Sequence, residues 1–244
     1  MKKLLIAASL TFLLCVYAGA SVPVQDMSPD ALALEYYGML NGQNTFDDER
    51  SILAIHMLRL HYSPAPTLRL TIGVGNSNFY VDPRVRCQTG LSLTAGAALF
   101  VPKIHPLISL SAGFDGYYIS GSSVDARSVG ILSVPYAGVI IHMGEFLDLE
   151  VGSSYQFFDL QKRHPDDPAL LARIQEQVRI YSTLTLHDPE SGVYLSGGLS
   201  SSANANTPKV ERRTFPSNTS VWFQFGIILK QDREIAKLDE TANW

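Results

Sequence analysis

Charged residues at alternate positions among small polar ones are the first candidates for chemistry in this sequence. Asp148 and Glu150 are separated by one residue, so in an extended chain both carboxylates share one side and could act as an acid and a base. Arg59, Arg69 and Arg179 occupy comparable positions, as do Asp115 and Lys230. One interpretation is a ring that selects or binds a solute. The other, which we favour, is a structural role, in which these charges are buried inside the fold and must pair with one another.

Histidine, serine and acidic residues show no spacing that predicts a catalytic or metal site. No pair of histidines has a ligand spacing such as His-x-x-x-His. His187 and Asp188 fall in a short turn, and His164 with Asp166 and Asp167 forms a run of solvated charge. An outer-rim hydrolase would need a Ser-His-acid set at the loop ends instead. We expect no catalytic residue, no metal and no cofactor.

Composition narrows the class of protein further. The chain has 244 residues, of which 46% are hydrophobic and 17% charged, which excludes a disordered chain. Its net charge of -4 argues against a nucleic-acid partner. Two cysteines are too few for a disulfide scaffold at this length.

The elements that must position the charges are β-strands, because hydrophobic residues recur with period two. In the segment 221–230, Phe223 and Phe225 alternate with Gln224 and Gly226. The same alternation predicts ten strands, most of them about 8–13 residues long, which suits a tilted strand that crosses a bilayer. The predicted strands are 32–40, 52–62, 67–74, 90–101, 107–119, 130–142, 146–158, 178–187, 192–199 and 220–230.

Short and long connections alternate between these strands. Four are short and turn-like, at 63–67, 102–106, 143–145 and 187–191. The longer polar ones are 41–51, 75–89, 120–129, 159–177 and 200–219. Strict alternation is typical of a transmembrane β-barrel, with tight turns at one end and long loops at the other. We therefore predict an all-β, ten-stranded, antiparallel up-and-down transmembrane β-barrel with both termini at the tight-turn end.

The composition of the two strand faces favours a membrane barrel over a soluble one. The apolar faces carry almost no charge, whereas the opposite faces mix Gly, Ser and Thr with scattered charges. A soluble barrel would need an exterior rich in Lys and Glu, while small residues allow a narrow lumen to close. The alternative is a soluble periplasmic or secreted ligand-binding barrel with its apolar faces inward. In the membrane interpretation Arg59, Arg69, Asp148, Glu150 and Lys230 lie near the tight-turn end of the lumen, and Asp115 and Arg179 lie nearer the loops.

The first twenty residues have the pattern of a secretory signal peptide. Lys2 and Lys3 precede an uncharged apolar run from Leu4 to Val16, and Ala18 and Ala20 supply small residues for cleavage. We expect cleavage after Ala20, a periplasmic segment over 21–31, the barrel over 32–230 and a polar tail over 231–244. Cys87 is then the single cysteine of the mature chain.

One stretch resembles a known family. Gly130 to Val139, with Pro135 and Gly138, resembles the strand of small bacterial outer-membrane β-barrel proteins that reads apolar-Pro-x-x-Gly before a short turn. The last strand, with Gln224, Gly226 and Leu229, partly resembles that family's assembly signal, although fourteen residues follow it here. The resemblance implies an outer-membrane location in a Gram-negative envelope, with the lipid bilayer and the outer-membrane assembly machinery as partners.

Three segments depart from the simple pattern. In 52–62, either His56 faces lipid or a bulge switches the faces near Met57. Pro135 needs an irregularity or a position without a ladder donor. The segment 167–177 has a capping Asp167 and a Pro168 suited to a first turn, which predicts a short helix over the barrel mouth or a partner-binding element.

The sequence therefore predicts a non-enzymatic outer-membrane protein with a structural, surface-display or narrow small-solute passage role. Ten strands enclose a lumen that side chains largely fill, so we expect no wide aqueous pore. The sequence indicates neither a transported solute nor an oligomeric state.

Overall fold

A computed structural model of the chain describes residues 29–44, 50–81, 88–122, 127–163, 170–202 and 219–229. The predicted signal peptide (1–20), the tail (231–244), Cys87 and Lys230 lie outside these residues, as does the segment 21–31 up to residue 28. Among the described residues, no helix is long and apolar enough to cross a membrane.

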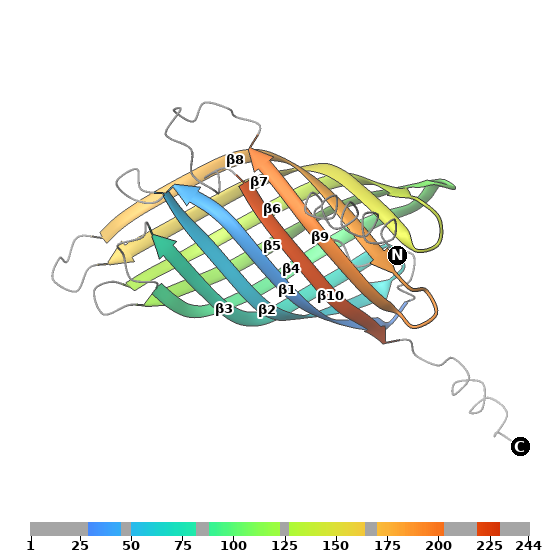
Figure 1. Ribbon diagram of the computed structural model, residues 1–244, viewed down its shortest axis with the longest axis horizontal. Coiled ribbons are helices and arrows are strands. Elements are labelled where there is room, and N and C mark those ends of the chain that lie inside the picture. The colour runs from blue at the N-terminus through green and yellow to red at the C-terminus, as the bar shows by residue number, and fades with distance from the viewer. Residues whose placement is uncertain are drawn as a thin grey trace, which may run out of the picture.

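Ten antiparallel strands form a closed barrel in which each strand pairs with the next and β10 pairs with β1 (Figure 1). The predicted up-and-down topology is confirmed, and each predicted strand corresponds to one strand of the barrel. The strands are β1 (Ala31–Asn44), β2 (Arg50–Ala65), β3 (Leu68–Val81), β4 (Gln88–His105), β5 (Ile108–Ser122), β6 (Arg127–His142), β7 (Leu147–Arg163), β8 (Leu170–His187), β9 (Val193–Ser202) and β10 (Thr219–Leu229).

The tight turns all lie at one end of the barrel, which we call the turn side; the other end is the loop side. Residues 66–67, 106–107, 143–146 and 188–192 join consecutive strands on the turn side. Leu32 pairs with Leu229, so β1 begins and β10 ends there as well. Gly144 and Gly192 have φ of 96° and 71°, a left-handed conformation that glycine adopts without a steric penalty in such turns.

Several strands extend further toward the loop side than the hydrophobic pattern predicted. β3 continues to Val81 and β7 to Arg163, through segments expected to be loops. The helix expected over 167–177 is wrong where it can be checked, because residues 170–177 belong to β8 and pair with β7 from Arg163 to Gln156. The backbone ladder explains the difference, since a helix at this position would leave a long unpaired edge on β7.

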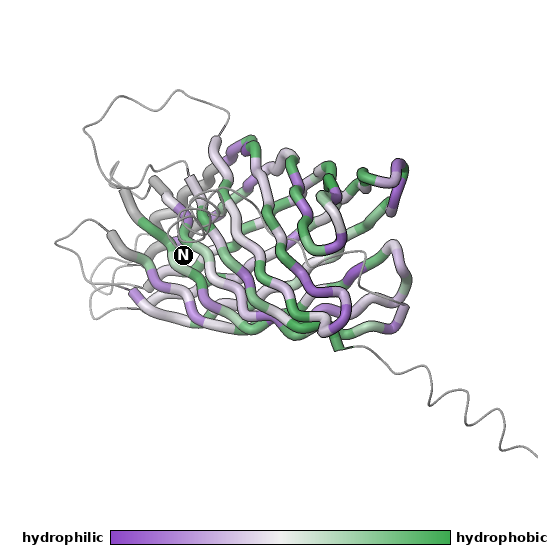
Figure 2. The backbone as a smooth tube through the Cα atoms, turned by 45° about the vertical axis from the view of Figure 1, so that its right-hand side comes forward, coloured by the Kyte–Doolittle hydropathy of each residue, from purple (hydrophilic) through white to green (hydrophobic). Residues whose placement is uncertain are grey.

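The faces of the strands point as predicted. Ile72, Leu99 and Ile180 on the outside are 60–61% exposed, whereas Thr185 and Gln224 inside are 0–1% exposed. Figure 2 shows the alternation of hydrophobic and hydrophilic residues along the strands. We define the apolar outer face by one exposed residue from each strand, namely Leu34, Leu58, Ile72, Leu93, Leu110, Ile131, Val151, Ile180, Leu195 and Phe225.

The structure shows how the strands accommodate His56 and Pro135. The β2–β3 register runs unbroken from Ser51 to Tyr62, so there is no bulge near Met57 and His56 points outward. There its Nδ1 lies 2.9 Å from the hydroxyl of Tyr36 on β1. At Pro135 the pairing of β6 with β7 is interrupted while the pairing with β5 continues, as expected for a residue without an amide donor.

Inward glycines provide the space for bulky inward side chains. A Cβ at Gly152 would lie 2.6 Å from the ring of Tyr181, and one at Gly130 would lie 2.9 Å from the ring of Phe158. Gly226 leaves room for Tyr194 in the same way. Because each ring lies over a glycine of a neighbouring strand, the lumen accommodates large residues within a ten-stranded circumference.

Candidate functional site

The turn-side interior contains a buried ion pair between neighbouring strands. Glu35 on β1 pairs in register with Arg59 on β2, and the Arg59 Nη2 lies 2.6 Å from the Glu35 Oε1. The Tyr194 hydroxyl donates to the other carboxylate oxygen at 2.9 Å, and His61 Nε2 lies 3.4 Å from Oε1. The Arg59 guanidinium also stacks 4.0 Å from the centre of the Tyr37 ring. This buried charge therefore has a carboxylate, hydrogen bonds and an aromatic face around it.

Glu150 on β7 is held by neutral donors. Ser111 donates to its Oε1 at 2.5 Å, and Tyr181 donates to the same atom at 2.8 Å. The carboxylate is 2% exposed. Glu150 and Asp148 share the inward face of β7, and the contacts described for the two carboxylates are with different residues.

Asp148 belongs to a chain of polar contacts close to the turn side. Its Oδ1 lies 2.7 Å from His142 Nδ1, and the other ring nitrogen of His142 lies 2.7 Å from Ser109 Oγ. His187 Nε2 lies 3.6 Å from Asp148 Oδ2. The backbone N–H of Lys103, a residue with φ of 47°, donates to Ser109 Oγ at 3.0 Å. The chain connects the turn-side end of β4 to β5, β6, β7 and β8.

The loop-side interior is divided between an apolar wall and a polar wall. Ten buried hydrophobic residues form one cluster, which we call the apolar plug, with Val134 and Trp222 packed against it. Its members are Tyr37, Met39, Leu53, Ile55, Met57, Phe79, Tyr117, Ile119, Leu132 and Phe158. The plug occupies the inward faces of β1, β2, β3, β5, β6 and β7.

On the polar wall, Arg179 of β8 is surrounded by neutral oxygens. Its Nε and Nη2 donate to Gln177 Oε1 at 3.1 and 2.7 Å, and its Nη1 donates to Ser200 at 3.2 Å and to Ser220. Nη2 also lies 3.4 Å from Asn41 Oδ1. The register explains the cluster, because Ser200, Ser220 and Asn41 are direct cross-strand partners on β9, β10 and β1.

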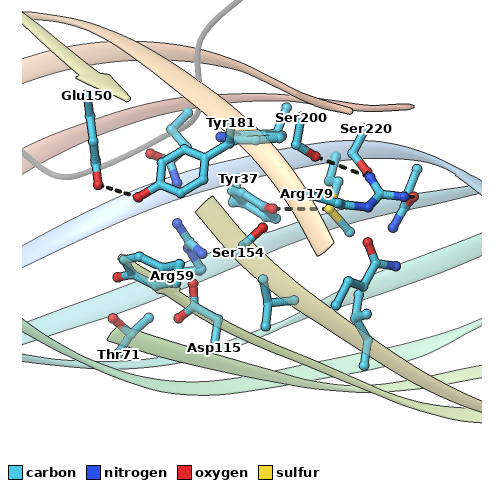
Figure 3. Close-up of a pocket in the computed structure, with 18 of the residues that line it drawn as sticks. Tyr37, Arg59, Thr71, Asp115, Glu150, Ser154, Arg179, Tyr181, Ser200 and Ser220 are labelled. Atoms are coloured by element: carbon cyan, nitrogen blue, oxygen red, sulfur yellow. Dashed lines mark hydrogen bonds between the residues drawn. The ribbon is translucent and has the colours of Figure 1, made fainter. Parts of the chain in front are cut away.

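A cavity lies between these groups and extends along the lumen (Figure 3). The space between its lining side chains amounts to about 800 Å³, including solvent that communicates with it. In Figure 3, Arg179 with Ser200 and Ser220 lies on one side of the view, and Arg59, Asp115 and Thr71 lie on the other. The lining also includes Arg69, Glu150, Leu132, Val134 and Trp222.

Six of the seven charged residues singled out in the sequence can be placed. Arg59, Arg69, Asp115, Glu150 and Arg179 line the cavity, whereas Asp148 contacts His142 and His187 nearer the turns; Lys230 lies outside the described residues. The ion-pair partners that sequence reasoning missed are Glu35, His61, His142 and His187. Glu35 could have been found by aligning the first two predicted strands as a hairpin, which places it opposite Arg59.

The arrangement is suited to binding rather than to holding a metal. Among the described residues, no group of three or more His, Cys, Asp or Glu side chains could hold a metal ion. The cavity instead offers cationic, carboxylate, hydroxyl and aromatic groups around one space, as small-molecule sites do.

Comparison with solved structures identifies similar barrels at low sequence identity. The translocator domain of the autotransporter NalP from Neisseria meningitidis has a TM-score of 0.51 at 12% identity, covering 84% of this chain and 90% of that chain. The transport unit of the autotransporter AIDA-I from Escherichia coli has a TM-score of 0.47 at 8% identity, covering 91% and 97%. The outer membrane protease OmpT from Escherichia coli has a TM-score of 0.37 at 12% identity, covering 84% and 97%. No protein-family model and no curated protein matches the sequence. At these identities the similarity concerns the fold.

Proposed function

We propose that this chain is an integral outer-membrane β-barrel whose narrow lumen binds and passes small solutes. The observation that carries the proposal is the apolar outer face, which continues around all ten strands of a closed barrel. Hydrocarbon is the solvent that such an exterior fits, and closure leaves no unpaired strand edge in the bilayer. A soluble protein seldom exposes a contiguous apolar surface of this extent.

The interior supports the same proposal. A soluble ligand-binding barrel would place its apolar faces inward, yet here the inward residues include the charged Glu35, Arg59 and Arg179, which are 1–5% exposed. The apolar plug narrows the loop-side lumen, and the cavity beside it has room for a small molecule. We therefore expect selective binding or slow passage rather than the conductance of a wide pore. Insertion by the outer-membrane assembly machinery is part of this proposal.

Two cysteine variants test the orientation of the faces. In a Cys87→Ser background, a spin label at Phe223→Cys should be accessible to oxygen and shielded from a water-soluble nickel chelate. The adjacent Gln224→Cys should give the reverse pattern, because its side chain points into the lumen and lines the cavity. Membrane fractionation and a heat-modifiability gel provide an independent test. Release of the protein into the soluble fraction, with both labels exposed to the chelate, would contradict the proposal.

Acyl hydrolysis is a second candidate function, and one observation favours it. Ser109, His142 and Asp148 are connected in the order used by serine hydrolases, with the hydroxyl on one ring nitrogen and the carboxylate on the other. In such a reaction Ser109 Oγ would add to an ester carbonyl while its proton passed to His142. Against it, Ser109 is 2% exposed and none of the three residues lines the cavity.

Labelling by a fluorophosphonate separates the two candidates. Covalent labelling that is lost in Ser109→Ala and kept in Ser111→Ala would establish the hydrolase. We expect no labelling of the folded barrel and a structural role for the three residues, in which they anchor the turn-side end of β4.

A further inference from the structure

Arg179 differs from an ordinary buried arginine in the partners it has. It is 1% exposed, and every group it contacts among the described residues is a neutral amide or hydroxyl oxygen. No carboxylate within the described part of the chain forms an ion pair with it. Taking a guanidinium out of water without a counter-charge is unfavourable, so a mobile anion would be bound strongly at this position.

The hydroxyl groups around Arg179 are arranged to donate to such an anion. Ser200 and Ser220 each accept a hydrogen bond from Arg179 Nη1, so their own protons are directed elsewhere. Neither hydroxyl donates to another described residue, and both line the cavity. The site therefore presents a positive charge together with two hydroxyl donors, the combination that binds oxyanions.

The same cavity has an apolar side. Leu132 and Val134 on β6 and Trp222 on β10 line it together with Arg179. Leu132 belongs to the apolar plug, and the other two residues pack against it. A ligand that contacts both sides needs an anionic head and a short apolar body.

We infer that the loop-side lumen is a binding site for small organic anions. A carboxylate or phosphate head accepts hydrogen bonds from Ser200 and Ser220 next to Arg179, and the apolar body lies against Leu132, Val134 and Trp222. The inference deepens the proposed function, because it names the class of solute that the lumen holds, and it rests on that function for its biological meaning.

The fluorescence of Trp222 provides a direct measurement of binding. The chain has two tryptophans, so Trp244→Phe leaves Trp222 as the only reporter. The full chain, folded in an uncharged detergent, is titrated with hexanoate, butyl phosphate, acetate, hexanamide and hexylamine. Hexanoate or butyl phosphate should bind at least tenfold more tightly than neutral hexanamide or cationic hexylamine. Whichever of the two binds identifies the head group, and weaker binding of acetate reports the contribution of the apolar body.

Charge variants then assign the site. Arg179→Gln should weaken binding of the organic anion at least tenfold, and Arg179→Lys should restore part of it. Lys103→Gln removes one positive charge from the exposed turn-side end of β4, outside the cavity, and should leave binding unchanged. The heat-modified gel shift of each variant shows that it is folded before it is titrated.

Two results would overturn the inference. One is equal binding of hexanoate and hexanamide, which would indicate partition into an apolar pocket without an anion site. The other is hexanoate binding that persists in a folded Arg179→Gln variant. The titration is done in detergent, so neither result bears on the membrane location. Conversely, failure of the spin-label test would not affect the binding measurement.

Discussion

Two buried arginines that line the same cavity, Arg59 and Arg179, are accommodated in different ways. Arg59, toward the turn side, has a carboxylate 2.6 Å away and an aromatic ring 4.0 Å away. Arg179, toward the loop side, has only neutral oxygens among the described residues. Both are at most 5% exposed, so burial does not distinguish them. The difference is that Arg59 has a carboxylate as its counter-charge, whereas Arg179 has none among the described residues.

This contrast separates structural charge from charge available to a ligand. A compensated pair holds strands together, and removing one partner leaves the other buried and unpaired. An uncompensated charge contributes little to folding and favours an anion from solution. The same reasoning makes the turn side of the lumen the structural end and the loop side the binding end.

The largest expected effect follows from removing the compensated arginine. Arg59→Met leaves the Glu35 carboxylate buried without its partner and should lower the free energy of unfolding by about 3–5 kcal/mol. Urea titration followed by the heat-modified gel shift measures it. The control is Glu145→Gln, which neutralises an exposed turn residue and should have no effect. The double variant Glu35→Leu, Arg59→Met should recover most of the loss; without recovery, the pair is not the cause.

Removing a member of the apolar plug tests what closes the loop side. Phe158→Ala deletes a ring that is 2% exposed, and such truncations cost about 3 kcal/mol or more. The space it leaves should also raise single-channel conductance in planar bilayers above that of the unmodified protein. Unchanged conductance in a folded variant would show that the plug is not the constriction.

A hydrogen bond to a buried carboxylate should have an intermediate effect. Tyr181→Phe removes the donor 2.8 Å from Glu150 Oε1 and should cost about 1.5–3 kcal/mol, as bonds to charged groups do. The matched control is Tyr62→Phe, which loses an exposed hydroxyl bond to Asp30 and should cost less than about 1 kcal/mol. Equal losses in the free energy of unfolding of the two variants would show that a hydrogen bond in the lumen contributes no more than one at the exposed rim.

The smallest effect is expected at the uncompensated arginine. Arg179→Met should leave the urea midpoint unchanged or slightly raised in the absence of anions, because no described carboxylate loses a partner. The same variant should show no added stability in hexanoate, whereas the unmodified protein should be stabilised as ligand is added. A loss comparable to that of Arg59→Met would show that both arginines are structural.

The fold could be predicted from the sequence because a barrel repeats one rule along every strand. The alternation of Phe223 and Phe225 with Gln224 and Gly226 fixes which face points outward, and the turn spacing fixes the topology. The loop-side limits of β3, β7 and β8 could not be predicted. There the alternation of hydrophobic and polar residues in the sequence becomes irregular while backbone pairing continues.

The site was harder to predict than the fold. Alternation places Arg59 and Arg179 on the same inward face of the barrel and gives no reason to treat them differently. Their neighbours come from the register between strands, which brings Glu35 to Arg59 and Ser200 and Ser220 to the same level beside Arg179. Register depends on loop lengths and side-chain fit rather than on composition.

The inward glycines have a consequence for how the barrel is assembled. The ring of Tyr181 lies over Gly152, that of Tyr194 over Gly226 and that of Phe158 over Gly130. If a hairpin slid by two residues, its faces would still be correct but each ring would collide with a side chain instead of resting over a glycine. The glycines therefore favour the correct register while neighbouring hairpins join. The hydrophobic pattern alone would also permit a register shifted by two residues, but that register would have steric clashes.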